Sequence, residues 1–427
     1  MRGMIDAPNV DIIPHMHVVI FEGSQWSAFT PLSLSRPVFA LATGASSLLE
    51  KQLRHLRPDR VTLWVRPEME PFCRSRILPR LKIPAEINRP LDDEPAVLFN
   101  GRAVHLASFE FPPHEAIVVD EGEVIRLAYA KRPGLGPQDV FGRTQPWLDL
   151  LELPQTMPQA RLVDSLWDLI HWNDESLVED FAHLHDRGMR PAPAGPHHLV
   201  NPEDVWLGAD VKLSPGCVLD ASKGPIMIGA RASIGANAVI NGPCAIGSHA
   251  KIRPLAFVRE GTSIGDGCTI GGEVSHSIFL SHSNKGHEGF VGHSYLGKWV
   301  NIGAGTTTSN LKNTYGEIRA RIGGVEVPTG RQFLGSVIGD HSKTAALTRL
   351  SAGTYIGFSS MVACPGLAPR LVPSYTFLTE QGAKPYDMAK AIEVAKRVFA
   401  RRDRQFNETD EQLMRYVAAA AVEVESA

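Results

Sequence analysis

Aliphatic side chains recur at every sixth position through the middle of the chain. The aliphatic positions are Ile228, Ile234, Ile240, Ile246, Ile252, Val258, Ile264 and Ile270. Four positions after most of them stands a small residue: Ala232, Ala238, Cys244, Ala250, Ala256, Thr262 and Cys268. A period of six fits neither the helical repeat nor the two-residue alternation of a half-buried strand. It predicts a solenoid of short strands, in which each hexapeptide forms one side of a triangular coil around an aliphatic interior.

The same repeat resumes twice further along the chain. The later interior positions are Val291, Leu296 and Ile302, then Ile338, Thr344, Leu350, Ile356 and Val362, with Ser342, Thr348, Thr354 and Ser360 at the corners. Two segments between the blocks, 275–290 and 311–333, lack the period. Because a solenoid expels insertions as loops, we expect both segments to leave the coil, and such loops on a rigid scaffold are where sites are built.

The N-terminal half shows a different pattern, with short apolar runs separated by a helical segment. We predict strands at 17–21, 60–65 and 96–102 and a helix at 46–56. The third strand ends in a polar turn, which is where open α/β sheets usually bind ligands. The pattern is typical of a Rossmann-like α/β domain.

These patterns divide the chain into four parts. We predict an α/β domain at 15–185, a Pro/Gly-rich linker at 186–204, a β-helix at 205–370 and a helical tail at 371–427. The tail carries two amphipathic segments, which we expect to cap the open end of the solenoid, as repeat proteins require.

Composition narrows the class of protein. The chain has 427 residues, 43% hydrophobic and 21% charged, with a formal net charge of -3. Such a balance provides no basic surface for nucleic acid or membranes. The cysteines lack CxxC spacing and are odd in number: Cys73, Cys217, Cys244, Cys268 and Cys364. They favour a reducing compartment. Because the start "MRGMIDAPNVDIIPH" has no apolar core and no long apolar run follows, we expect a cytoplasmic protein.

One stretch of the repeat region carries a recognisable motif. In "KGHEGFVGHSYLGKWVNIGAGTTTSN", His287 follows a glycine and precedes Asn301 by fourteen residues and Asn310 by twenty-three. The motif and its uneven aliphatic-Gly steps resemble the acetyltransferase half of the bifunctional pyrophosphorylase/glucosamine-1-phosphate N-acetyltransferase (GlmU) family. The resemblance implies a left-handed parallel β-helix and a homotrimer with each acetyl-transfer site between neighbouring coils.

The resemblance also implies roles for these residues. Acetyl transfer to an amine requires the amine to lose its proton, and a neutral imidazole near pH 7 suits that task, so His287 would be the general base. Asn301 and Asn310 would hold the acceptor sugar through their amides. Backbone N–H groups of the third block would face acetyl-CoA, and Ala346, where the family has a serine, and Cys364 are the candidates there. The alternative for His287 is a solvated loop histidine.

Some positions depart from the family. Phe290 replaces a tyrosine and loses a hydroxyl contact, and the family lysine that grips the sugar phosphate falls at Ser275 or His276. Arg253 and Arg259 are candidate phosphate anchors, because a guanidinium offers a bidentate fork. Ordinary surface charge is an equal alternative for both arginines.

A metal site is a weaker reading of the same region. His276, His282 and His293 lie close together in the sequence, but their spacing matches no known set of metal ligands.

The start of the chain resembles the sugar nucleotidyltransferases. In "VVIFEGSQWSAFTPLSLSRPVFALATG", "PLSLSRP" aligns with the signature of that family, and "EGSQWSAF" replaces its glycine-rich loop. The signature arginine falls at Ala28 and the signature lysine at Val38. Because those cations normally neutralise the nucleoside triphosphate, their loss counts against the standard mechanism. The opening of this chain closely resembles that of a subgroup of GlmU-like proteins in which the N-terminal signature motif is altered.

Other residues are candidates to contact a nucleotide. Arg36, Lys51 and Arg102 would be substitute phosphate contacts, and Asn100 stands where the family has a metal-binding aspartate. Asn173, just before a helix, matches an asparagine that helps to hold Mg²⁺ in the family. Structural roles compete for each of them, including an N-cap role for the aspartate after Asn173.

Together these features predict an acetyl-CoA-dependent N-acetyltransferase that acts on an amino-sugar phosphate, joined to a nucleotidyltransferase-like domain in sugar-nucleotide biosynthesis. Two alternatives stay open. One is a sugar-1-phosphate nucleotidyltransferase, using a nucleoside triphosphate and Mg²⁺, in which the β-helix only oligomerises. The other is a non-catalytic sugar-nucleotide binder.

Overall fold

The computed structural model forms two compact units that the chain enters more than once. The described residues are 16–105, 114–120, 124–156, 161–185, 192–322, 325–364 and 366–425. The sheet unit comprises 1–23, 52–100 and 106–160, and the coil unit comprises 24–51, 101–105 and 161–427. Three segments that the sequence assigns to the α/β domain, 24–51, 101–105 and 161–185, therefore belong to the compact unit that contains the β-helix.

The sheet unit is built on one mixed β-sheet. Its strand order is β5 (Ala85–Ile87), β4 (Arg60–Trp64), β1 (His17–Phe21), β6 (Ala96–Asn100), β9 (Val124–Ala130) and β8 (Ala116–Asp120). β1 runs parallel to β4 and β6, and β9 runs antiparallel to β6 and β8. The short helices of this unit are α2 (Glu70–Phe72), α3 (Pro137–Gly142) and α4 (Gln145–Leu148). The predicted α/β character of this half is confirmed, and α1 (Leu48–Leu56) matches the predicted helix.

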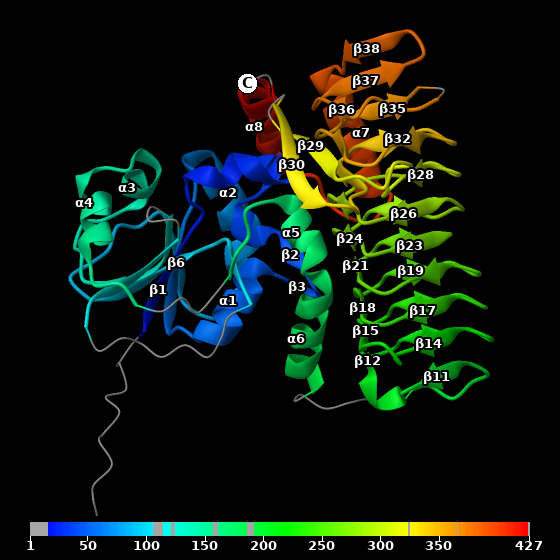
Figure 1. Cartoon of the computed structure of the whole chain (residues 1–427), viewed down its shortest axis with the longest axis horizontal. Coiled ribbons are helices and arrows are strands. Elements are labelled where there is room, and N and C mark those ends of the chain that lie inside the picture. The colour runs from blue at the N-terminus through cyan, green and yellow to red at the C-terminus, as the bar shows by residue number, and fades with distance from the viewer. Residues whose placement is uncertain are drawn as a thin grey trace, which may run out of the picture. The chain divides into compact units, whose positions relative to one another are not determined.

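The coil unit contains a parallel β-helix with three faces (Figure 1). Face 1 consists of β11 (His198–Val200), β14 (Val218–Asp220), β17 (Val239–Asn241), β20 (Phe257–Val258), β23 (Glu273–Ser275) and β26 (Phe290–Gly292), continued by β28 (Thr307–Thr308) and β33 (Arg349–Leu350). Face 2 consists of β12 (Val205–Leu207), β15 (Ile226–Ile228), β18 (Cys244–Ile246), β21 (Thr262–Ile264), β24 (Ile278–Phe279), β27 (Tyr295–Leu296), β31 (Ser336–Ile338), β34 (Thr354–Ile356) and β36 (Leu371–Val372). Face 3 consists of β13 (Lys212–Leu213), β16 (Ser233–Ile234), β19 (Lys251–Ile252), β22 (Thr269–Ile270), β25 (Asn284–Lys285), β32 (Lys343–Thr344), β35 (Met361–Ala363), β37 (Thr376–Thr379) and β38 (Gly382–Pro385). Each corner is named by the two faces that it joins, so the 3/1 corner connects face 3 to face 1.

The register of the strands explains the hexapeptide period. Ile228, Ile246 and Ile264 lie side by side on face 2, and Ile234 pairs with Ile252 on face 3. All of them are buried in one core cluster together with the small corner residues of the repeat. Every third hexapeptide therefore returns to the same face, and the predicted left-handed β-helix fold is confirmed.

The coil also begins inside the predicted linker. β11 pairs in parallel with β14, although it lies within 186–204. Residues 186–191 of that segment, like the N-terminal residues 1–15, lie outside the described residues.

The expectation that 275–290 leaves the coil is wrong. Within this segment β24 and β25 continue the parallel ladders of face 2 and face 3, with Phe279 and Lys285 at interior positions. A lysine can replace an aliphatic residue there because its ammonium reaches the carbonyl oxygens of Gly271, at 2.6 Å, and His287, at 3.0 Å. The segment shortens the coil instead, because the interior step from Val274 to Phe279 is five residues, and the exposed turn that carries His287 follows β25.

The second non-periodic segment does leave the coil. Residues 311–333 contain an antiparallel hairpin of β29 (Ile318–Ile322) and β30 (Val325–Arg331). Ile318 is buried in the same cluster as Val337 and Tyr355 of face 2. The insertion is therefore packed against the coil through an apolar stripe on β29.

Face 2 is covered by segments of the coil unit. α5 (Leu166–His171) and α6 (Asn173–His185) lie along it, and Figure 1 shows α6 running beside β12, β15 and β18. Leu177 of α6 packs with Met227 and Ala245, while Phe29 lies in one apolar cluster with Tyr295. The outward side chains of face 2 thus form an interface within the chain, and the turn with His287 joins the other two faces.

Two C-terminal helices are present as predicted, α7 (Met388–Ala400) and α8 (Glu408–Glu425). They lie along the 2/3 corner, where Phe399 stacks on Trp299 at 4.3 Å between ring centroids and the Tyr375 hydroxyl donates to the Met414 carbonyl. The sequence pattern predicts that the helices cap the open end of the solenoid. The edge strand of the last coil, β37, is paired instead with β38, which runs antiparallel to it. The helices take this position because their apolar stripes meet a column of aromatic corner residues. Among the described residues, no helix is long and apolar enough to span a bilayer.

Candidate functional site

His287 lies on an exposed turn between β25 and β26, at the 3/1 corner. The turn closes through Gly289, whose φ of +120° suits only glycine and whose missing side chain makes room for the Thr306 carbonyl. From inside the coil, Lys285 donates to the backbone carbonyl of His287 at 3.0 Å. Burial lowers the pKa of Lys285 to about 8, partly offset by the carboxylates of Glu288 and Glu273. The imidazole is thus presented to solvent on a turn with a rigid inner support.

Three other predicted site residues share this corner with His287. The Gly305 N–H donates to the Glu288 carbonyl at 2.9 Å, and the Leu347 N–H donates to the Ala304 carbonyl at 2.7 Å, so these coils are adjacent. This ladder places Ala346 on the same corner as His287, followed by the half-buried Cys364 after β35. Arg253, which is exposed, lies on the corner on the other side of His287.

A second group of predicted residues meets at the 1/2 corner. Phe290 begins β26 on face 1, and its ring and the Asn310 amide both lie over Gly292, where a side chain would collide with them. The Asn310 Nδ2 lies 2.8 Å from Nδ1 of His293. The ring of His293 stacks on His276, with centroids 4.7 Å apart and planes 5° from parallel. Asn310 and His276 are therefore joined through His293, and the ring of Phe290 lies beside the Asn310 amide.

Arg259 lies at the same corner beside two carboxylates. Its guanidinium is 3.4 Å from Glu273 and 3.5 Å from Glu260. The side chain is 39% exposed, so these ion pairs contribute little to stability. The arginine can therefore exchange partners. Its role as a phosphate anchor stays a prediction.

Asn301 stands apart from both groups. It bridges β25 and β32 on face 3, and its Oδ1 accepts a hydrogen bond from Asn284 Nδ2 at 2.8 Å. Phe290 and Asn310 border face 1 instead. Within one chain the described structure does not bring Asn301 together with Asn310.

The three histidines considered for a metal site are divided between two corners. His276 and His293 stack at the 1/2 corner, whereas His282 stacks on Trp299 at the 2/3 corner, with centroids 4.2 Å apart. They form no common ligand set.

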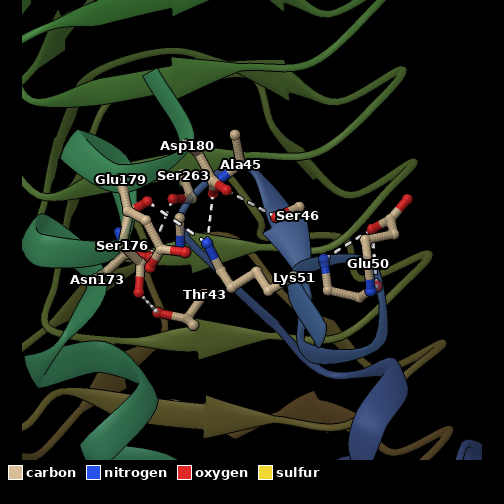
Figure 2. A network of polar contacts seen from close by, with 12 residues as sticks. Thr43, Ala45, Ser46, Glu50, Lys51, Asn173, Ser176, Glu179, Asp180 and Ser263 are labelled. Carbon is tan, nitrogen blue, oxygen red and sulfur yellow. Dashed lines mark hydrogen bonds and ion pairs between the residues drawn. The ribbon is translucent and has the colours of Figure 1, made fainter. Parts of the chain in front are cut away.

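The candidates for nucleotide binding on the N-terminal segment have protein partners. Lys51 is 1% exposed, and its Nζ lies 2.7 Å from Oδ2 of Asp180 on α6 (Figure 2). The same carboxylate accepts from the Ala45 N–H at 2.7 Å and from the Ser46 hydroxyl at 2.9 Å. Figure 2 shows this buried network, which fastens residues 43–51 to α6.

Asn173, at the start of α6, is fully buried in the same network. Its Oδ1 accepts from the Gly44 N–H at 2.6 Å and the Ser263 hydroxyl at 3.1 Å, and its Nδ2 donates to the Gly261 carbonyl at 2.9 Å. Mg²⁺ needs accessible oxygen ligands and keeps several waters. The amide of Asn173 therefore does not fit a magnesium site, and in the described part of the chain no group of three acidic, histidine or cysteine side chains could hold a metal.

The remaining candidates are also engaged. Arg36 is 2% exposed and forms a buried ion pair with Asp340 of the coil. Burial raises the pKa of Asp340, but Arg36, with smaller contributions from His341 and Lys298, lowers the pKa of that carboxyl overall. Arg102 donates to the Val163 carbonyl and to Asp164. Asn100 donates from Nδ2 to the Ile125 carbonyl. Each of these polar groups already has a partner in the protein. The contact of these three residues with a nucleotide stays a prediction.

The sequence reasoning missed two residues that shape these sites, Lys285 and Asp180, and considered His293 only as a metal ligand. Lys285 would have been found by aligning it with Ile270, its partner one coil earlier. Asp180 carries no such signal, because nothing local shows which cation it meets.

Comparisons with known proteins give the following similarities. Residues 18–188 match the family model described as "Sugar nucleotidyl transferase". The "Bifunctional protein GlmU" of Synechococcus elongatus is 32% identical over 195 residues, covering 42% of this chain and 39% of that protein. The "Bifunctional sugar-1-phosphate nucleotidylyltransferase/acetyltransferase" of Sulfurisphaera tokodaii is 37% identical over 137 residues, covering 32% and 34%. The chain thus spans well under half the length of the curated relatives it matches. An Arabidopsis UDP-N-acetylglucosamine acyltransferase structure aligns with 48% of this chain and 77% of its own, at 11% identity and a TM-score of 0.27.

Proposed function

We propose that this chain, which is similar to GlmU proteins over part of its length, is an acetyl-CoA-dependent N-acetyltransferase acting on the amine of an amino-sugar phosphate such as glucosamine-1-phosphate. The observation that carries the proposal is the 3/1 corner. His287 is exposed at this corner, and its backbone carbonyl accepts a hydrogen bond from Lys285. It lies between the exposed Arg253 and the exposed Ala346.

The corner fits acetyl-CoA in two respects. Small side chains at Ala304 and Ala346 leave space along the edge, and within the described residues neither backbone N–H has a hydrogen-bond partner. Such N–H groups are suited to thioester and pantetheine oxygens, including the developing oxyanion. When bound, acetyl-CoA supplies an activated acyl carbon.

The residues of the chain perform the proton transfers. His287 accepts the proton of the attacking amine on its free imidazole nitrogen, which keeps the amine nucleophilic while the new C–N bond forms. The imidazolium then returns a proton to the departing thiolate sulfur. Arg253 and Arg259 would neutralise the phosphate of the acceptor, and Asn310 would bind a hydroxyl or the amine.

A homotrimer would complete the site. Asn301 lies on face 3, while Phe290 and Asn310 border face 1, so a pocket that uses all three needs face 3 of one copy against face 1 of the next. Exposed leucines at the 3/1 corner support this arrangement: Leu255, Leu347 and Leu367, with 71%, 75% and 63% exposure.

A second candidate is sugar-1-phosphate nucleotidyl transfer, favoured by the family match over 18–188. Against it stand the absence of the signature cations at Ala28 and Val38 and the buried, fully engaged amide of Asn173. The third, a non-catalytic sugar-nucleotide binder, leaves the exposed His287 corner without a role.

The test is a thiol-release assay with acetyl-CoA against a panel of amino sugars and their 1-phosphates. We expect turnover with an amino-sugar 1-phosphate, and none in His287→Ala. The matched control is His198→Ala, an exposed histidine on β11, which should retain full activity. Unchanged turnover in folded His287→Ala would refute the mechanism. Release of pyrophosphate with UTP, Mg²⁺ and N-acetylglucosamine-1-phosphate would instead support the second candidate.

A further inference from the structure

We infer that His293 is a positioning residue for the acceptor site: it holds the side-chain amide of Asn310 by its nitrogen, so that the amide oxygen is directed to the sugar. This inference rests on the proposed function. The contact that carries it joins Asn310 Nδ2 and His293 Nδ1 at 2.8 Å. Because an amide nitrogen only donates, the imidazole nitrogen must be the acceptor.

The imidazole of His293 is fixed in place. It lies between the ring of His276 at 4.7 Å and the ring of Phe333 at 5.2 Å, stacked on both. Its backbone is tied to the coils on each side, through an N–H donated to the Ser275 carbonyl and a carbonyl that accepts from the Gly335 N–H. The two stacks fix the plane of the ring, and the hydrogen bond with Asn310 selects the flip that turns Nδ1 toward the amide.

The protonation state of His293 suits an acceptor. Burial, together with smaller contributions from the neighbouring His276, Arg259 and His171, lowers its pKa to about 3. A carboxylate also reaches this cluster, since Asp174 Oδ2 lies 3.9 Å from His276 Nε2, and His276 in turn stacks on His293. At neutral pH His293 is therefore uncharged and its Nδ1 lone pair is available.

Asn310 is left with one unused polar atom. Its backbone carbonyl accepts from the Leu334 N–H at 3.0 Å, and its Nδ2 is held by His293. Within the described residues its Oδ1 has no hydrogen-bond partner. Because Gly292 has no side chain, the amide lies beside the ring of Phe290, over face 1. The oxygen is an acceptor suited to a sugar hydroxyl or an amine N–H, chemistry that an amide turned the other way would not provide.

The experiment is a double-mutant cycle on acetyl transfer. His293→Phe keeps an aromatic ring between His276 and Phe333 but removes the acceptor. We expect the KM for the acceptor sugar to rise about fivefold to tenfold, the range for one lost hydrogen bond, with kcat and the KM for acetyl-CoA unchanged. Asn310→Ala should raise the same KM, and the double variant should be no worse than Asn310→Ala alone. His282→Phe, which makes the same exchange at a stacked corner histidine on the 2/3 corner, is the matched control and should retain wild-type values.

A second variant guards against misfolding, because residue 293 has a φ of +47°. Asparagine tolerates that conformation and offers an amide oxygen, so His293→Asn should recover part of the acceptor affinity. Additive effects in the cycle, or an unchanged KM in His293→Phe, would overturn the inference while leaving His287 as the base. Loss of the proposed function would show separately, as His287→Ala with undiminished turnover. A crystal structure of His293→Phe gives a readout independent of activity: the Asn310 amide should turn or become disordered, and an unmoved amide would also overturn the inference.

Discussion

The buried ion pair between Lys51 and Asp180 allows a quantitative prediction for the substitution Lys51→Met. Both side chains are almost fully buried, at 1% and 2% exposure, with Nζ 2.7 Å from Oδ2. Methionine fills the volume of the lysine stem but removes the ammonium that pairs with the Asp180 carboxylate. Removing one partner of a buried pair costs roughly 3–5 kcal/mol. Ala45 and Ser46 still donate to Asp180, so we expect a value near the lower end, about 3 kcal/mol.

The assay is urea unfolding followed by tryptophan fluorescence and circular dichroism. Because the chain has two compact units, the shift is to be read in the transition of the coil unit and checked by hydrogen exchange at α6. Lys51→Met/Asp180→Asn should recover part of the loss, since the uncompensated charge is gone and the amide oxygen still accepts a hydrogen bond. Lys396→Met, which removes an exposed pair with Glu411, is the matched control and should change stability little. If Lys51→Met behaves like Lys396→Met, the pair is not buried as described.

Four further predictions concern the coil unit. Lys285→Met should leave the fold intact and lower kcat several-fold, because the His287 turn loses its inner hydrogen bond; an unchanged kcat in steady-state kinetics would show that the support is dispensable. Leu347→Glu should convert the proposed trimer to smaller species in light scattering, since it places charge in the apolar corner; a variant that is trimeric like the wild type would refute that interface. The pKa of Asp340 is lowered by Arg36 despite burial, so its stabilisation is present above its unfolded pKa near 3.8 and is lost as pH falls through the folded value. Asp340→Asn should therefore be less stable than wild type at neutral pH, and this difference should shrink on acidification; a constant difference across the acid titration would contradict the linkage. The thermal midpoint should be the same in EDTA and in Mg²⁺, because Asn173 is engaged by the protein; a magnesium-dependent rise that Asn173→Ala removes would contradict this.

The β-helix was predictable in detail because its determinants are local and repeated. Each hexapeptide needs one aliphatic side chain inside and one small residue at the corner, and Ile228, Ile246 and Ile264 satisfy the same requirement on adjacent strands. The period therefore predicts both the fold and the interior. It failed at 275–290, because Lys285 occupies an interior position by finding two carbonyl oxygens that no pattern of hydrophobicity reports.

The amino-acid sequence alone determined the coil, its corners and the exposed position of the His287 motif, since these follow from residues that are neighbours along the chain or one repeat apart. Only the tertiary structure decided what the polar residues of the N-terminal segment contact. Arg36 meets Asp340, Lys51 meets Asp180, and Asn173 meets the Gly261 carbonyl. A charged or amide side chain looks the same in a motif whether it binds phosphate or a distant carboxylate. Its partner and its burial are set by long-range packing, and these two quantities determine whether the side chain remains available to a ligand.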